Sequence, residues 1–353
     1  MKAISPVTTL ASFEVRSSTP MLLGGYDGCA CHGSNDCEPL RSQSLKGVLR
    51  WWSRAALAGA LYSRGVNGRE LIKRVLEASG NLWGSTNHVS PVILRTYGSI
   101  TRYSCSSISG HSRYRLTSLG HPCRRGSLCG WLRSGEVYLN VPTWENLPTS
   151  HVEHAVLSLI VLFHLGGLGK GSRRGLGSLD IRRWNNVDPS YIDPSNISST
   201  LRRLSVTASN IVSRYPAGGS RGELPAIPAI AEDVFRLFRC KIENPVRAAV
   251  EFSRAVLRPQ LSIRHGAWIL GLPRRGYKAG VSRRASPIMF SAHRGVGFIS
   301  AFYSSDWPNR IRHGRHIISV TDEEIERHMN AALDHILSRL NQYGIKCREV
   351  KVW

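Results

Sequence analysis

Two kinds of hydrophobic periodicity alternate along the first half of the chain. Apolar residues spaced three or four apart mark a helix over 44–62, and the strongly apolar stretch 152–165 predicts a buried helix. Strand-like alternation or short apolar runs mark 8–17, 91–101, 114–119, 137–141 and 176–184. We interpret the overall order as β-α-β-β-α-β, which these segments exceed by one strand-like run. This order is typical of two helices covering one face of a four-stranded antiparallel sheet.

The second half repeats the mixture less regularly. Helical patterns lie at 198–214, 244–257 and 321–342, and strand-like runs at 268–272, 286–291, 297–303 and 345–352. A length of 353 residues suits about two domains. We therefore predict an α+β fold of two ferredoxin-like (RNA-recognition-type) domains with inserted loops, residues 1–187 and 188–353, divided in the Pro- and Ser-containing stretch 188–199.

The charge of the chain indicates the chemistry of its partner. Lys and Arg number 47 against 24 Asp and Glu, a net charge of +23, so we expect a polyanion. The chain has no uninterrupted apolar run of membrane-spanning length and no secretory signal at its start, which predicts a cytoplasmic protein. Only three of the eight cysteines are closely spaced, which disfavours a secreted disulfide scaffold.

The glycine-rich segment 166–178 (GGLGKGSRRGLGS) is the most informative basic motif. Its glycines allow backbone N–H groups to turn toward an anion, and its cations supply charge. The Walker pattern is excluded because Lys170 precedes a glycine and the loop follows a helix. A flexible solvated turn is the alternative to a phosphate-binding loop, for which the candidate residues are Gly169, Lys170, Ser172, Arg173 and Arg174.

Two further basic segments accompany this loop. In the first helix, the stripe Lys46, Arg50 and Arg54 follows a start at which Arg41 and Ser44 favour phosphate. Trp51 lies beside the stripe, where it can stack on a base or on a neighbouring subunit. Near 268–290, a hairpin-like loop with basic residues can reach over an RNA strand, or remain solvated, and it contains Arg274, Arg275, Lys278, Arg283 and Arg284.

A cysteine-rich loop at 24–38 offers four soft ligands, Cys29, Cys31, His32 and Cys37. Zinc is chemically possible there, but the spacing is not that of a standard zinc knuckle, and a disulfide or free thiols explain it equally well. We expect no metal and no other cofactor. For catalysis, Asp27 and Asp36 are the isolated loop carboxylates near basic motifs, and no positioned catalytic set is apparent.

Taken together, three segments resemble the signatures of the RAMP superfamily of CRISPR effector proteins. The first runs from Thr19-Pro20 and Leu23-Gly24-Gly25 through Leu40-Arg41, Ser44-Leu45-Lys46-Gly47 and Leu49-Arg50-Trp51-Trp52 to Arg54-Ala55. The second is the glycine-rich loop. The third comprises Trp268, Gly271-Leu272-Pro273-Arg274, Arg283-Arg284 and Ser286-Pro287. Within the superfamily, the chain is most similar to the first subunit of type III-B Cmr complexes.

The resemblance implies a function in RNA-guided antiviral defence. A member of this family would sit at the end of a backbone of other RAMP subunits. Its basic residues would hold the 3′-side part of the guide RNA and its paired target without cutting them. The alternative is a RAMP endoribonuclease that cuts target RNA with a loop carboxylate such as Asp27 and a metal, or guide RNA with a histidine such as His32.

Overall fold

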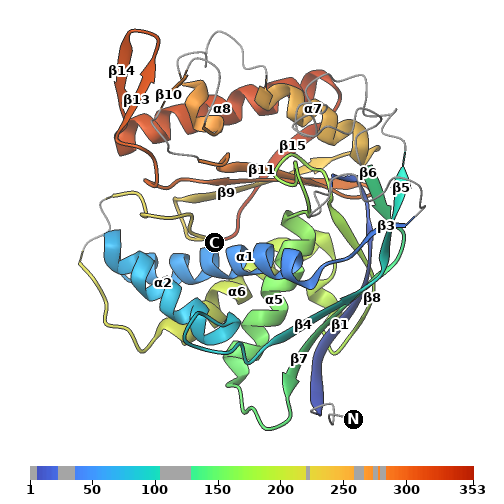
Figure 1. Cartoon of the computed structure of the whole chain (residues 1–353). Helices are drawn as coiled ribbons and strands as arrows, with labels where there is room; N and C mark the ends of the chain where they lie inside the picture. The colour runs from blue at the N-terminus through green and yellow to red at the C-terminus, as the bar shows by residue number, and fades with distance from the viewer. Residues whose placement is uncertain are drawn as a thin grey trace.

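The computed structural model describes residues 6–22, 36–103, 129–219, 223–257, 266–272, 277–278 and 284–353 (Figure 1). Its elements form mixed helical and antiparallel-sheet layers, which confirms the predicted α+β class. Within these residues, no helix combines the length and apolarity needed to span a membrane.

The first half is built on a four-stranded sheet of order β4-β7-β1-β8, in which all neighbours are antiparallel. Its strands are β1 (Val7–Ser17), β4 (Ile93–Tyr97), β7 (Gly135–Pro142) and β8 (Leu179–Asn185). The helices of this half are α1 (Ser42–Ser63), α2 (Gly68–Trp83) and α5 (Thr149–Leu165). Alternate residues of β1, among them Ala11, Phe13 and Val15, are buried against this helical layer.

The second half has a sheet of order β11-β12-β9-β15, again antiparallel throughout. Its strands are β9 (Phe235–Lys241), β11 (Ile288–Ala292), β12 (Val296–Phe302) and β15 (Lys346–Val350). Helix α7 (Pro245–Leu257) follows β9, and α8 (Asp322–Gln342) precedes β15. In chain order both sheets therefore place their second, third, first and fourth strands side by side.

Two smaller sheets flank this core. One has the order β2-β6-β5-β3 and consists of β2 (Met21–Leu22), β3 (Asp36–Pro39), β5 (Ser99–Tyr103) and β6 (Cys129–Leu132). The other has the order β10-β13-β14 and consists of β10 (Tyr277–Lys278), β13 (Arg310–His313) and β14 (His316–Ser319). Short 3-10 turns lie at Pro189–Tyr191, Pro194–Asn196 and Ala267–Leu270.

Helices cover both faces of the second-half sheet. Figure 1 shows α7 and α8 on one face and the helical layer containing α1 and α5 on the other. Every residue of β11 and β12 is buried, as expected for strands covered on both sides. Phe302 of β12 packs 5.2 Å from the ring of Trp51 and 5.8 Å from that of Trp52, both in α1. The halves thus share one hydrophobic core.

Helix α6 (Ile197–Val212) packs against α1 and α5. The segment after the predicted domain boundary at 188–199 therefore still packs against the first half, and the second-half sheet begins only at β9.

All five predicted helices are confirmed, since α1, α5, α6, α7 and α8 coincide with the five helical patterns. The predicted strand 268–272 is wrong, because its apolar residues form the 3-10 turn Ala267–Leu270. The predicted strand 91–101 divides into β4 and β5, which belong to different sheets. The end of the expected loop 24–38 pairs as β3, and the predicted strand 114–119 lies outside the described residues.

A disulfide joins the two strands at one edge of the second-half sheet. Cys240 of β9 and Cys347 of β15 face one another in register and are bonded, with an S–S distance of 2.03 Å. The sequence did not indicate this pair, because the two cysteines are 107 residues apart.

Candidate nucleic-acid interface

The glycine-rich loop 166–178 connects α5 to β8 and inserts between the two halves. Gly175 and Gly177 have φ angles of 84° and 66°, values that other residues rarely adopt. A Cβ at Gly175 would lie 2.8 Å from the Phe290 ring, and one at Gly177 would collide with the carbonyl oxygen of Leu168. These glycines are therefore required for close packing, a role that the sequence alone did not separate from anion binding.

Only the tip of this loop is open to solvent. Gly169 and Lys170 are exposed, whereas Ser172, Arg173 and Arg174 are half-buried. The backbone of the loop continues into the second half, since the Phe290 N–H donates to the Arg173 carbonyl oxygen at 3.0 Å. An incoming phosphate can thus reach the tip without disturbing the packed part.

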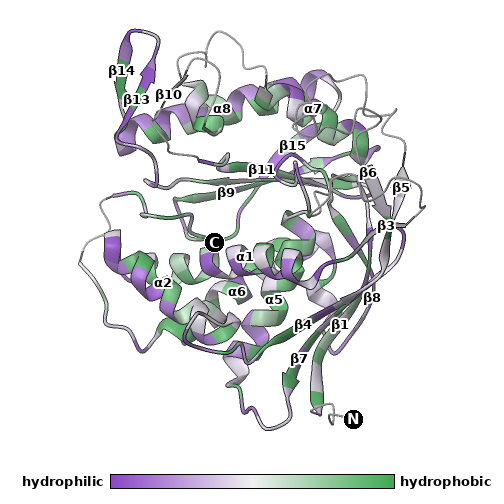
Figure 2. Ribbon diagram, viewed as in Figure 1, coloured by the Kyte–Doolittle hydropathy of each residue, from purple (hydrophilic) through white to green (hydrophobic). Residues whose placement is uncertain are grey.

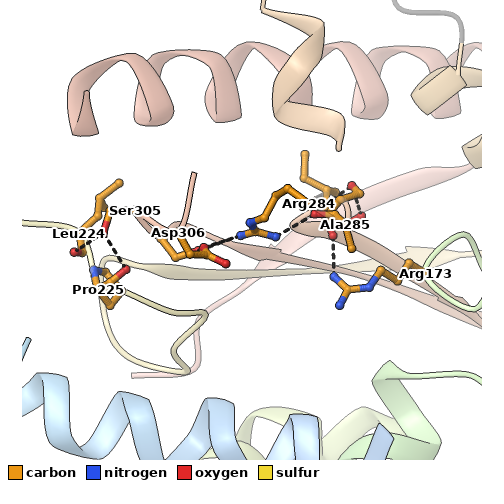
Figure 3. Close-up of polar contacts among 10 residues, drawn as sticks. Arg173, Leu224, Pro225, Arg284, Ala285, Ser305 and Asp306 are labelled. Carbon is orange, nitrogen blue, oxygen red and sulfur yellow. Dashed lines mark hydrogen bonds and ion pairs between the residues drawn. The ribbon is translucent and has the colours of Figure 1, made fainter. Parts of the chain in front are cut away.

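Arg173 binds the second half of the same chain. Its Nη1 donates to the carbonyl oxygen of Ser286 at 2.7 Å (Figure 3). Its Cζ lies 5.1 Å from the centre of the Trp51 ring. Burial, followed by repulsion from Arg284, lowers the pKa of Arg173 to about 10. The Arg173 side chain, which we expected to be free to bind phosphate, therefore makes contacts within the chain.

Arg284 is also internal, which corrects its predicted place in an exposed basic loop. Its side chain is only 9% exposed, and its Nη2 lies 2.7 Å from Oδ1 of Asp306 (Figure 3). The guanidinium stacks 4.7 Å from the centre of the Trp307 ring, and Nη2 also donates to Ser304 Oγ at 3.1 Å. Burial lowers the pKa of Arg284, and the Asp306 carboxylate opposes that shift.

The start of α1 remains exposed and cationic. Arg41 is the N-cap, and its side chain makes no capping hydrogen bond. The Oγ of Ser42, the first helical residue, lies 2.9 Å from Thr96 Oγ1. Arg41 and Ser44 are exposed, and the first turn contains no acidic residue. Burial and the neighbouring charge of Arg50 lower the pKa of the half-buried Lys46. Backbone N–H groups at such a start favour an anion.

The other two residues of the basic stripe, Arg50 and Arg54, bind helix α2, which was not predicted from the sequence. Arg50 Nη2 donates to the Gly84 carbonyl oxygen at the end of α2, at 3.1 Å. Arg54 Nε donates to Ser79 Oγ at 3.1 Å, and burial followed by the charge of Arg50 lowers the Arg54 pKa. Arg50 and Arg54 therefore stabilise the packing of α1 against α2. The Arg50 cation also lies at the C-terminus of α2, where the helix dipole favours a positive charge.

Trp51 does not have the exposed position that stacking on a base requires. Its ring is half-buried and lies 5.1 Å from Trp52 and 5.2 Å from Phe302, with edge-on geometry. Together with the Arg173 guanidinium, these rings occupy the contact between the halves. We therefore correct the predicted base-stacking or subunit-stacking role of Trp51 to an internal packing role.

Several predicted residues lie outside the described chain, namely Cys29, Cys31, His32, Arg274, Arg275 and Arg283. Cys37 and Lys278 fall in β3 and β10. Among the residues that the structure describes, no group of three or more His, Cys, Asp or Glu side chains is arranged to hold a metal ion.

A basic hairpin that was not predicted from the sequence lies at β13 and β14. These strands carry the segment RIRHGRHIIS, in which Arg310, Arg312 and Arg315 are exposed. The signal that could have identified it is a glycine flanked by basic residues, with apolar residues further out on each side.

Comparison with known proteins gives consistent matches. Residues 15–180 match the model of the RAMP superfamily. The chain is 24% identical over 303 residues to the CRISPR system Cmr subunit Cmr1-1 of Pyrococcus furiosus, covering 79% of this chain and 84% of that relative. It is 29% identical over 191 residues to Cmr1-2 of the same organism, covering 49% of this chain and 95% of that relative.

Solved structures share the fold over nearly the whole chain. The apo crystal structure of Cmr1 from Pyrococcus furiosus gives a TM-score of 0.59 at 21% identity, covering 99% of each chain. A chain in the cryo-EM structure of the type III-B Cmr-beta complex bound to cognate target RNA gives 0.62 at 12% identity, covering 93% of this chain and 99% of that one. The resemblance inferred from the sequence is thereby confirmed: this chain is similar to the Cmr1 proteins of the RAMP superfamily.

Proposed function

We propose that this chain is a non-catalytic RNA-binding subunit of a type III-B CRISPR (Cmr) antiviral effector complex. It caps the backbone of other RAMP subunits and holds the 3′-side part of the guide RNA with its paired target. The similarity to Cmr1 proteins and to a chain of an RNA-bound Cmr complex supports this assignment. The role requires no cofactor and places the protein in the cytoplasm.

The observation that carries the proposal is a pair of basic segments open to solvent, the start of α1 and the tip of the glycine-rich loop. We call them together the α1-loop surface, and they comprise Arg41, Ser44, Lys46, Gly169 and Lys170. The loop also contacts the middle of α1, where the Arg173 guanidinium lies over the Trp51 ring. Exposed cations and uncapped N–H groups suit phosphates, which are bound without regard to base sequence.

Both halves are proposed to be ferredoxin-like domains, residues 1–187 and 188–353. Their sheets have equivalent strand orders, β4-β7-β1-β8 and β11-β12-β9-β15, and each has a helix between its first and second strands and another before its last strand. This is the arrangement of a ferredoxin-like domain. Helix α6, which follows the division in the chain, packs on the first domain.

RNA affinity measured over a salt series tests the α1-loop surface. The double variant Lys46→Ala/Lys170→Ala should bind single-stranded RNA more weakly, and the salt dependence of log K should fall by about 1 to 2 because up to two phosphate contacts are lost. Lys73→Ala/Lys241→Ala is the matched control, since both lysines are exposed and lie outside the surface. Equal effects of the two double variants would contradict the assignment.

A cleavage assay on the same samples separates binding from catalysis. End-labelled RNA incubated with the purified chain, with and without Mg²⁺, should shift in a gel and remain intact. RNA cleavage by the wild type that Asp27→Ala abolishes would overturn the non-catalytic role and favour the endoribonuclease alternative.

A further inference from the structure

The β13-β14 hairpin has a regular geometry that fixes which side chains share a face. The strands pair from Arg310 opposite Ser319 to His313 opposite His316, joined by a two-residue turn. Gly314 has a φ of 59° and the φ of Arg315 is not positive, which is typical of a type II′ turn. The hairpin is therefore a tightly turned ribbon, and its strand residues alternate between two faces.

One face of this ribbon is anchored and the other is free. Ile311 is fully buried, so its face packs against the body of the molecule. Arg310 and Arg312 flank Ile311 and point to the opposite face, where their cross-strand neighbours are Ser319 and Ile317. Ile317 is 66% exposed and lies directly opposite Arg312.

The free face is cationic and has no internal counter-charge. The segment 310–319 contains three arginines, two histidines and no carboxylate. In the described part of the chain, Arg310, Arg312 and Arg315 form no ion pair, unlike Arg236 and Arg284, which pair with Glu349 and Asp306. Figure 2 shows the hydrophilic character of β13 along this ribbon.

We infer that the β13-β14 hairpin is a second RNA-binding surface, in which Arg310, Arg312 and Arg315 bind backbone phosphates and Ile317 packs against ribose or base. Arg310 and Arg312 lie about 6.8 Å apart along one strand, so both can contact the same RNA strand. Arginine suits this role because its fork binds phosphate oxygens bidentately. The inference rests on the proposed RNA-binding function and extends it.

The position of the hairpin makes this surface separate from the first. In Figure 1 the hairpin projects from the body near the start of α8, on the side away from the sheet β2-β6-β5-β3. The α1-loop surface combines the start of α1, in the helical layer below the second-half sheet, with a loop whose backbone bonds to β11 of that sheet at Phe290. RNA bound at both surfaces would extend from these segments to the hairpin.

The test compares two triple variants of the full chain by fluorescence anisotropy with labelled single-stranded RNA over a salt series. Arg310→Ala/Arg312→Ala/Arg315→Ala should reduce the affinity at least about tenfold near physiological salt and lower the salt slope by about 2. The control Arg69→Ala/Arg202→Ala/Arg348→Ala removes the same charge from exposed positions elsewhere and should change both values much less.

A second pair of variants tests the apolar position without removing an arginine. Ile317→Asn removes the apolar contact and should weaken RNA binding with the salt slope unchanged, whereas Ile317→Val keeps an apolar side chain and should retain most of the affinity. The position is exposed, so neither change should alter the thermal midpoint.

The outcomes distinguish this inference from the proposed function. If the wild type binds RNA and the hairpin triple variant matches its control, the hairpin inference is overturned while the proposed function stands, and an acidic protein becomes the better partner for this face. If the wild type fails to bind RNA at all, the proposed function itself fails, and the hairpin inference with it.

Discussion

Arg173 carries a positive charge into the contact between the two halves. Its hydrogen bond to the Ser286 carbonyl oxygen and its stacking on Trp51 would both be lost in Arg173→Ala. We expect this variant to lower the free energy of unfolding by about 1–3 kcal/mol, because a partly buried charge-assisted hydrogen bond disappears. Lys170→Ala, at the exposed tip of the same loop, should leave stability unchanged. Urea denaturation of both variants makes the comparison, and equal stabilities would refute the structural role of Arg173.

His154 forms the centre of a buried polar network beneath α1. Its Nε2 lies 2.9 Å from Ser53 Oγ, its Nδ1 lies 3.3 Å from Thr207 Oγ1, and Trp83 Nε1 donates to Ser53 Oγ at 2.8 Å. Burial, with a smaller contribution from His151, lowers the pKa of His154 to about 3. The ring is therefore neutral in the folded protein.

This lowered pKa predicts acid sensitivity. Below the unfolded value near 6.5 the unfolded chain binds a proton that the folded chain excludes, so stability falls as the pH drops toward 3. The contribution approaches about 1.4 kcal/mol per pH unit for one such group. Chemical denaturation from pH 7 to pH 4 should show a smaller loss for His154→Gln than for the wild type. His88→Gln, at an exposed histidine, is the control and should follow the wild type.

Residue types were easier to predict than residue environments. The basic residues of the loop and the first helix were identified from the sequence, and Lys170, Arg41 and Ser44 are indeed exposed. Arg173 and Arg284 also lie in basic segments of the sequence. Arg173 nevertheless binds a carbonyl oxygen, and Arg284 a carboxylate, of a distant segment of the chain. A guanidinium suits RNA phosphates and internal acceptors equally, so only the tertiary structure distinguishes the two uses.

Among the secondary-structure elements, the edge strand β15 is covalently attached to β9. The bond between Cys240 and Cys347 closes a loop of about 100 residues, which restricts the unfolded chain. We expect Cys347→Ser to lower the free energy of unfolding by about 2–4 kcal/mol. Reductant should destabilise the wild type by a similar amount and have little further effect on the variant. A thermal midpoint of the wild type that does not change when reductant is added would contradict a stabilising role of the disulfide.

The helices were predicted from local patterns, such as the apolar residues at helical spacing in α1 and the continuous apolar stretch of α5. Helix α2 was missed although Leu71, Val75, Ala78 and Leu82 have helical spacing, since glycines at 68 and 80 interrupt its sequence. The wrongly predicted strand at 268–272 has a different cause. A short apolar run is compatible with a strand and with a buried turn, and its length does not distinguish the two.

For the molecule as a whole, the shared core predicts a single unfolding transition. Residues of α1 and β12 pack directly against one another, so neither half can unfold without exposing the apolar surface of the other. Differential scanning calorimetry should give one peak whose calorimetric and van't Hoff enthalpies agree. Two resolved peaks would show that the halves are energetically independent.

The double coverage of the second-half sheet also bears on how the chain is made. Residues of the first half leave the ribosome before β9, β11 and β12 are synthesised, and they already include α1 and α5. The emerging sheet therefore meets helices that are already synthesised and against which its inner face, with Phe302, can pack. Translation in this direction protects a strand-rich, aggregation-prone segment, whereas a circular permutant that begins at β9 would expose that face until synthesis ends.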